Sequence, residues 1–201
     1  MKKFLIIIIL LILSLPSIAD NIEGTNTYKD YVFVLIHGMN EDASLFTGGK
    51  NFGNLKAHLE NDLGLTGRVF CYSFSNNRGD NFLLAKELGD RSYNNNYSFS
   101  DGNNLVSMGG KCWLDKAKAD FLADKRNAGK PIPTKYILLT HSMGNYAARA
   151  YIYSNQLYKE GGFYNNDVSK VVFIAPPLLG SDMALFAYKA YLMTPGAAKT
   201  A

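Results

Sequence analysis

Four apolar runs alternate with helical patterns along this chain, and that alternation limits the possible folds more than any other feature. Residues 31–38, "YVFVLIHG", form a continuous stretch of β-branched, aliphatic and aromatic residues that ends at a glycine. Such a stretch is typical of a strand buried on both faces. Similar runs at residues 67–75, 135–141 and 169–177 predict three more strands.

Helical patterns separate the predicted strands. Residues 52–64 place apolar side chains at helical spacing and stop at Gly64, and further helices are predicted over residues 112–129 and 145–159. Strands that alternate with helices pair in parallel. We therefore expect an α/β fold with a mostly parallel sheet and helices on both of its faces.

Residues 75–111 depart from this alternation. Apart from a short helical piece at 82–88, the segment is rich in Asn, Ser, Gly and Tyr. A loop of this length inside a compact domain is either functional or mobile. We interpret it as an active-site flap in preference to a passive insertion.

The first 19 residues predict a secretory signal peptide. Two lysines precede an apolar stretch at 4–15, and Ser17 and Ala19 provide a small-residue cleavage site. An uncleaved anchor is the alternative, but a spanning helix needs about 20 apolar residues and this stretch is shorter. We expect cleavage after residue 19, one domain over 20–201, and a secreted or periplasmic location.

Charge and motif content exclude several classes of partner. Lys and Arg number 21 against 17 Asp and Glu, and two of the lysines lie in the predicted signal peptide. This near balance argues against nucleic acid as a partner. The chain has no CxxC pair and no H-E-x-x-H motif, which would indicate a metal site. It also has no glycine-rich phosphate-binding motif, which would indicate a nucleotide. We therefore expect no metal and no cofactor.

The two cysteines leave two interpretations open. Export to an oxidising compartment favours a disulfide between Cys71 and Cys112. Two unpaired thiols are the alternative, with Cys71 a small buried residue of a strand.

The third apolar run leads directly into "THSMG", residues 140–144. A nucleophilic serine on a tight turn between strand and helix requires small neighbours two positions away, which gives the motif G-x-S-x-G. Gly144 meets this requirement downstream of Ser142, whereas Thr140 departs from it upstream. Ser142 as an ordinary helix N-cap is the alternative. The turn is expected to direct the His141 side chain away from the serine.

A second motif, "HGMN", ends the first apolar run. Acyl transfer needs two backbone N–H groups aimed at the developing oxyanion, one after the nucleophile and one after an earlier strand. Met143 and Met39 occupy these positions, and Gly38 permits the sharp turn. His37 is expected to orient this loop rather than to take the serine's proton.

The segments "VFVLIHGMN", "YILLTHSMGN" and "VVFIAPPLLGSDMA" resemble those of α/β-hydrolase lipases and esterases, over about residues 31–183. The resemblance implies a three-layer α/β-hydrolase fold. In that fold, the first strand of this chain corresponds to the third strand of the family. It also implies Ser142 as nucleophile, Met39 and Met143 as oxyanion donors, and a small-molecule or lipid ester as substrate, with transient contact with a membrane surface. A thioesterase, an amidase and a non-catalytic secreted binding protein with the same fold remain alternatives.

The family's order of catalytic residues, Ser then Asp or Glu then His, is incomplete here. None of the three histidines, His37, His58 and His141, follows Ser142. Asp182 follows the fourth run on the side expected for the acid, although a helix-cap role is favoured over catalysis. We therefore expect a hydrolase sheet truncated after about four core strands, without the catalytic histidine.

The chain is rich in aromatic residues, with 13 Tyr and 12 Phe. Tyr146, Ala150, Tyr153 and Leu157 recur at helical spacing. Such a stripe fits core packing better than a surface that binds acyl chains or lipid.

Overall fold

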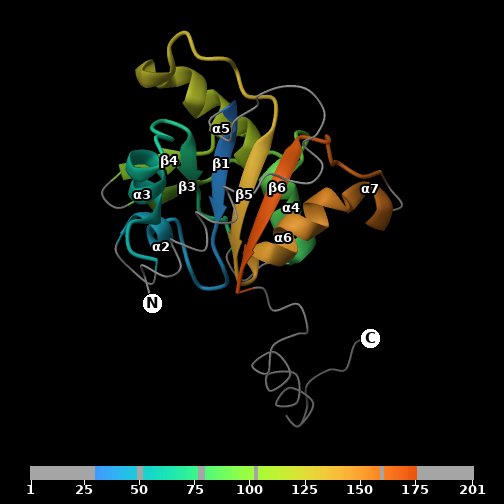
Figure 1. Ribbon diagram of the computed structural model, residues 1–201. Helices are drawn as coiled ribbons and strands as arrows, with labels where there is room; N and C mark the ends of the chain where they lie inside the picture. The colour runs from blue at the N-terminus through green and yellow to red at the C-terminus, as the bar shows by residue number, and fades with distance from the viewer. Residues whose placement is uncertain (1–29, 49–51, 77–79, 102–103, 159–160, 176–201) are drawn as a thin grey trace.

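The computed structural model describes residues 30–48, 52–76, 80–101, 104–158 and 161–175 (Figure 1). The predicted signal peptide at 1–19 and the candidate acid Asp182 lie outside these ranges. In chain order the described elements are β1 (Val32–Ile36), α2 (Ser44–Thr47), α3 (Leu55–Asp62), β2 (Val69–Cys71), α4 (Asn81–Gly89), β3 (Ser98–Asp101), β4 (Asn104–Ser107), α5 (Trp113–Ala123), β5 (Tyr136–His141), α6 (Gly144–Ile152), α7 (Ser154–Leu157) and β6 (Val168–Ile174).

The four predicted strands form one sheet, in the order β2-β1-β5-β6, and every neighbouring pair is parallel. In this register Leu35 of β1 lies between Cys71 of β2 and Leu139 of β5. Strands β3 and β4 form a separate antiparallel hairpin. The expected α/β class with a mostly parallel sheet is confirmed.

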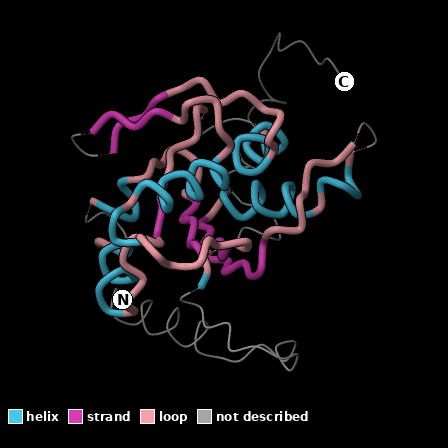
Figure 2. The backbone as a smooth tube through the Cα atoms, turned by 90° about the horizontal axis from the view of Figure 1, so that it is seen from above, coloured by secondary structure: helices cyan, strands magenta, loops and turns pink. Residues whose placement is uncertain are grey.

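Helices cover both faces of this sheet, and Figure 2 shows them beside the central strands. On one face, Val34 and Leu138 pack in a cluster with buried residues of α4, α5 and α6. On the other, Phe33 and Leu139 pack with residues of α2 and α3. Both faces of β1 and β5 are therefore apolar, which explains why these strands appear in the sequence as unbroken apolar runs.

Several element boundaries differ from those predicted. The helix expected over 112–129 ends at Ala123, because Asp124 is extended (ψ 114°) and its carboxylate accepts a 2.9 Å bond from the Arg126 amide of a short 3-10 turn. The helix expected over 145–159 divides at Tyr153 into α6 and α7. Strand β2 covers only Val69–Cys71 of the predicted run.

The short helical piece expected at 82–88 within residues 75–111 is present as α4 (Asn81–Gly89). Asp80 caps this helix, and its side chain accepts a 2.7 Å bond from the Phe82 amide. Leu84 and Leu88 of this helix are buried in the core. Gly89 permits close packing with α6, because a Cβ there would lie 2.1 Å from the Tyr151 ring. The role of residues 75–111 as an active-site flap stays a prediction.

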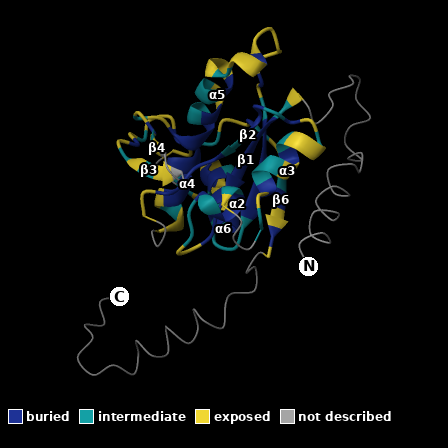
Figure 3. Ribbon diagram, turned by 90° about the vertical axis from the view of Figure 1, so that its left-hand side faces the viewer, coloured by how far each residue is buried: buried dark blue, intermediate teal, exposed yellow. Residues whose placement is uncertain are grey.

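The helical stripe predicted to pack in the core is also misplaced. Tyr153 and Leu157 are 47% and 60% exposed, and they line a surface groove with Tyr146 and Ala150. The buried residues of α6 are mostly small, Gly144, Asn145, Ala147 and Ala148, together with Tyr151. Small side chains let the helix axis approach the sheet. Figure 3 shows the central strand β1 buried among the surrounding elements.

Cys71 and Cys112 are both buried and no disulfide joins them, which goes against the disulfide interpretation. Cys71 packs in the cluster that contains α2 and α3, whereas Cys112 packs in the cluster that contains α4 to α6. The sheet separates the two thiols. The alternative, in which Cys71 is a small buried strand residue, is the one that the structure bears out.

Candidate functional site

The connectivity of the sheet has a topological switch point between β1 and β5. From β1 the chain passes to β2 on one side, and the later strands β5 and β6 extend the sheet on the other side. In open α/β sheets, ligands bind beyond the carboxyl ends of the strands at such a switch point. Gly38 follows the first of these two strands and Ser142 follows the second. The carboxyl ends of β1 and β5 lie at the lower edge of the sheet in Figure 1.

Ser142 has a strained backbone. Its φ is +51°, a left-handed conformation that non-glycine residues rarely adopt. Its amide donates a 3.1 Å bond to the carbonyl of Ile174 at the end of β6. Met143 returns to right-handed helical geometry (φ −60°) and starts α6. The serine is therefore at the apex of a tight strand-to-helix turn.

Gly144 is required by the close approach of α6 to β1. A Cβ at this position would lie 2.5 Å from the carbonyl oxygen of His37 and 2.8 Å from a methyl group of Ile36. Any side chain would push the helix away from the first strand. The small downstream residue in the motif therefore has a steric cause.

Thr140, the departure from the motif, is held by Asn145. The Thr140 hydroxyl donates to Asn145 Oδ1 at 2.5 Å. Asn145 Nδ2 in turn donates to the carbonyl of Ser142 at 2.6 Å and lies 3.3 Å from that of Ile174. Both residues are fully buried. Their side chains therefore fasten the strained turn to the ends of β5 and β6.

Sequence reasoning missed Asn145. A signal was present, because a polar residue directly after Gly144 lies on the same side of the helix as Ala148, which faces the sheet. A buried amide needs hydrogen-bond partners. Here those partners are the residues of the turn itself.

The structure brings the two predicted loops together at Gly38. A Cβ on Gly38 would lie 2.8 Å from the Cβ of Ser142 and 3.3 Å from its Oγ. The absence of a side chain at Gly38 therefore leaves room for the Ser142 hydroxyl.

The two candidate oxyanion donors lie on these loops. Met39 is 50% exposed, and Asn40 after it is left-handed (φ +59°), so the chain turns sharply directly after the first strand. Within the ranges that the structure describes, neither the Met39 nor the Met143 amide donates to a protein acceptor. Among the described residues, both N–H groups are therefore candidates for contact with a bound oxyanion.

His37 is fully buried and both of its ring nitrogens have partners. Nδ1 lies 2.8 Å from the Gly38 carbonyl oxygen and donates to it. Nε2 accepts a 3.1 Å bond from the amide of Phe74. These contacts define a neutral ring, and burial lowers the pKa of His37 below its ordinary value. This imidazole supports the first loop and is not directed at Ser142.

His141 contacts Glu41, a residue that sequence reasoning did not single out. The His141 Nδ1 lies 2.9 Å from Glu41 Oε2, and its ring lies edge-on to Phe52 with centroids 4.9 Å apart. The same carboxylate oxygen accepts a 2.8 Å bond from the Gly38 amide. Glu41 and His141 are 100 residues apart, so no local pattern predicts this contact.

Other candidate residues lie elsewhere. His58 pairs with Asp62 one turn along the exposed side of α3, at 3.0 Å. Asp167, before β6, accepts bonds from Tyr151 and Arg91 and stabilises the opposite edge of the sheet. Among the described residues, no cluster of three or more His, Cys, Asp or Glu side chains is suited to hold a metal ion.

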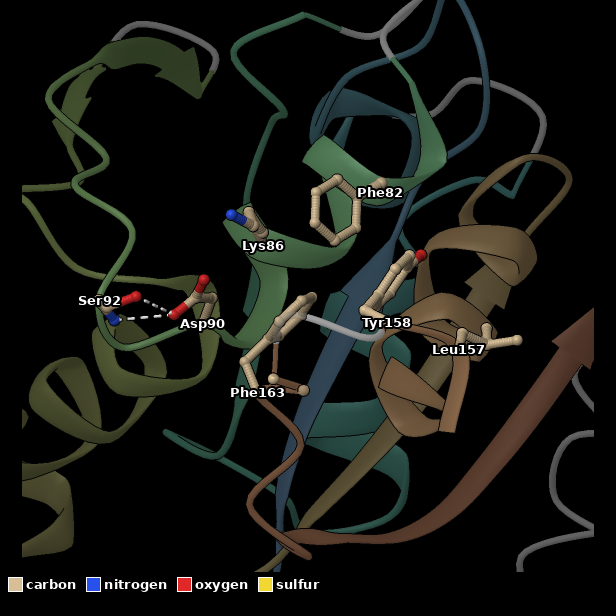
Figure 4. A pocket seen from close by; sticks show the side chains of 9 residues that line it. Phe82, Lys86, Asp90, Ser92, Leu157, Tyr158 and Phe163 are labelled. Carbon is tan, nitrogen blue, oxygen red and sulfur yellow. Dashed lines mark hydrogen bonds between the residues drawn. The ribbon is translucent and has the colours of Figure 1, made fainter. Parts of the chain in front are cut away.

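A surface pocket lies between α4, α7 and the segment before β6 (Figure 4). The rings of Phe82 and Tyr158 are 4.2 Å apart there, and the Lys86 ammonium lies 4.8 Å from the centroid of Phe82. Asp90 accepts bonds from the backbone and hydroxyl of Ser92. Ser142 does not line this pocket, so the pocket is separate from the serine turn.

No family model matches the chain, and neither a curated protein nor a solved structure does. In the described part of the chain, no helix has the length and apolar character needed to cross a membrane. The strained serine turn and its neighbours are therefore the features that point to a function.

Proposed function

We propose that the protein is an exported serine hydrolase of the α/β-hydrolase type that cleaves carboxylic esters through an acyl-enzyme on Ser142. The observation that carries the proposal is the left-handed backbone of Ser142 (φ +51°) on the turn between β5 and α6. A strained serine at this place is the hallmark of a nucleophile on a strand-to-helix elbow. Helix capping would not require the strain.

The surroundings of the serine support acyl transfer. In the proposed reaction, Ser142 Oγ attacks the ester carbonyl, the alcohol leaves with the serine's proton, and water then hydrolyses the acyl-enzyme to the free acid. The amides of Met39 and Met143 would stabilise the oxyanion in both steps. Gly38, against the serine side chain, keeps the approach to Oγ open.

The order of the strands is a second support. Ser142 follows β5, and β1, which carries the Gly38 loop, is the neighbouring parallel strand. The proposal equates β1 with the hydrolase family's third strand. Family members take their second oxyanion donor from the loop after that strand. The proposal therefore assigns Met39 this role.

The substrate class follows from the chemistry of the serine. Small-molecule and lipid esters are proposed first, with transient contact at a membrane surface for lipids. Thioesters and amides use the same nucleophile and oxyanion donors, so a panel of substrates decides among them. The predicted signal peptide places the reaction outside the cytoplasm.

A secreted binding protein that keeps the fold without catalysis is the second candidate. The contacts of the histidines favour this candidate. His37 is hydrogen-bonded at both ring nitrogens, and His141 Nδ1 faces Glu41. Among the described residues, no imidazole contacts the Ser142 hydroxyl. Without an adjacent base, a serine loses most of the rate of a complete triad.

Hydrolysis of p-nitrophenyl acetate and butyrate by the purified full chain separates the two candidates. The hydrolase predicts a burst of p-nitrophenol that is stoichiometric with protein and is lost in Ser142→Ala. An equal rate in wild type and Ser142→Ala, or no release above background, contradicts the proposal. Asn165→Ala, an exposed change away from the turn, serves as the control.

A further inference from the structure

Glu41 joins the two loops that form the candidate site. It lies in the turn after β1, yet its carboxylate reaches the end of β5, where His141 directly precedes Ser142. The side chains of His141 and Glu41 are 17% and 22% exposed, so the contact is largely shielded from solvent. Shielding strengthens a hydrogen bond to a charged acceptor relative to the same bond in water.

One oxygen of this carboxylate, Oε2, accepts both bonds. The Gly38 amide donates at 2.8 Å, and His141 Nδ1 lies at 2.9 Å. Both this oxygen and Ser142 Oγ contact the position that a Cβ of Gly38 would occupy, at 2.7 and 3.3 Å. The carboxylate is therefore beside the serine hydroxyl.

The bond to Gly38 also determines which amide of the first loop remains available. Because the Gly38 N–H points to Glu41, the next N–H, that of Met39, is the one free to face a substrate. Loss of the carboxylate would release the Gly38 amide and let the Met39 amide reorient.

We propose that Glu41 is a positioning residue, which locks the first loop against the serine turn and thereby fixes the Met39 amide in the oxyanion site. This inference rests on the proposed function of Ser142. The role assigned to Glu41 is that of a hydrogen-bond acceptor for the Gly38 amide and for His141, and it includes no proton transfer.

The acceptor role predicts different results for two substitutions. Glu41→Gln keeps an oxygen that accepts both bonds, whereas Glu41→Ala removes it. We expect Glu41→Ala to lower the rate of Ser142 acylation by a p-nitrophenyl ester at least about 10-fold, and Glu41→Gln to stay within about 3-fold of wild type. A proton-transfer role would instead make both variants equally slow.

Asp62→Ala is the matched control. It removes a histidine–carboxylate pair of nearly the same length, 3.0 Å, on the exposed side of α3. This variant should acylate at the wild-type rate. Glu41→Ala at the wild-type rate, or Glu41→Gln as slow as Glu41→Ala, overturns the proposal.

Hydrogen exchange of the Gly38 amide separates this proposal from the proposed function. In the folded full chain, the amide should be protected in wild type and Glu41→Gln and should exchange at least about 10-fold faster in Glu41→Ala. If wild type is not acylated, the proposed function fails, and exchange still decides the positioning role. Equal exchange in all three chains overturns it.

Discussion

Ser142 stores strain at the apex of its turn. A left-handed backbone costs a non-glycine residue about 1–2 kcal/mol, and here the surrounding bonds to Ile174 and Asn145 hold it. Strain of this kind persists where the rest of the fold over-determines the conformation, which is common at functional sites. The serine is therefore expected to lower stability in exchange for an exposed hydroxyl.

Ser142→Gly tests this strain. Glycine adopts positive φ without steric cost, whereas alanine retains the strain of serine. We expect Ser142→Gly to exceed Ser142→Ala in free energy of unfolding by about 1 kcal/mol, measured by urea denaturation. Equal stabilities would show that the turn is unstrained. Neither variant should hydrolyse esters.

Asn145 is the residue whose side chain holds the turn closed. Asn145→Ala leaves the Thr140 hydroxyl without its 2.5 Å acceptor and removes the donor to the Ser142 carbonyl. The Thr140 hydroxyl keeps its 3.3 Å bond to the Val172 carbonyl, and the Ser142 carbonyl keeps the 3.1 Å bond from the backbone amide of residue 145. The cost is therefore that of the lost buried hydrogen bonds, about 0.5–1.5 kcal/mol each, and we expect a total loss of about 2 kcal/mol in urea denaturation.

The exposed Asn165 provides the comparison. Asn165→Ala removes a surface bond to the Phe163 carbonyl and should change stability by less than about 0.5 kcal/mol. Similar losses in the two alanine variants would contradict the role given to Asn145.

At the scale of elements, a buried carboxylate ties α4 to the rest of the fold. Glu87 is 2% exposed and accepts bonds from the amide and hydroxyl of Ser75 and from the Tyr97 hydroxyl. Burial raises the pKa of Glu87 above its ordinary value, and the hydrogen bonds offset only part of this effect. The folded protein thus binds the proton of Glu87 more tightly than the unfolded chain does.

The contribution of Glu87 to the free energy of unfolding should therefore fall as the pH rises through this pKa. The contribution of Glu87 is most favourable below the ordinary glutamate value of 4.5 and is lost as the pH rises through the higher folded pKa. Glu87→Gln does not titrate. We expect its unfolding free energy, relative to wild type, to increase from about pH 5 to about pH 8. If the difference in unfolding free energy between Glu87→Gln and wild type stays constant or decreases over this range, the upward shift of the Glu87 pKa is contradicted.

The sequence pattern predicts some of the elements better than others. Strands β1 and β5 were predictable because burial on both faces leaves an unbroken apolar run. Helix α6 was predictable as a helix, but the side facing the sheet was not, because both sides carry apolar residues. Ala147, Ala148 and the large Tyr151 are buried, while Tyr153 at the end of the helix is exposed.

The residues of the candidate site also differ in whether the sequence could predict them. Gly38, Ser142 and Gly144 were predictable, because each belongs to a short sequence motif at the end of an apolar run. Glu41 was not, because its contact with His141 joins two loops that only the paired register of β1 and β5 brings together.

At the scale of the whole molecule, the sheet divides the core into two apolar layers. Cys71 belongs to one layer and Cys112 to the other. A disulfide requires Cα atoms within about 7 Å of each other, which would need the sheet to open.

We therefore expect both thiols to stay reduced in protein purified without reductant. Alkylation after unfolding should add two labels by mass spectrometry, and dithiothreitol should leave the melting temperature unchanged. An unlabelled chain whose melting temperature falls with dithiothreitol would contradict the separation of the two layers.

The central claim is that Ser142 is a nucleophile set in a preformed oxyanion site. Its most direct test is to incubate the folded full chain with a fluorophosphonate probe and map the adduct by mass spectrometry. We predict one adduct, on the peptide that contains Ser142, which disappears in Ser142→Ala and after heat unfolding. An unmodified wild-type chain, or labelling that persists in Ser142→Ala, would contradict the claim.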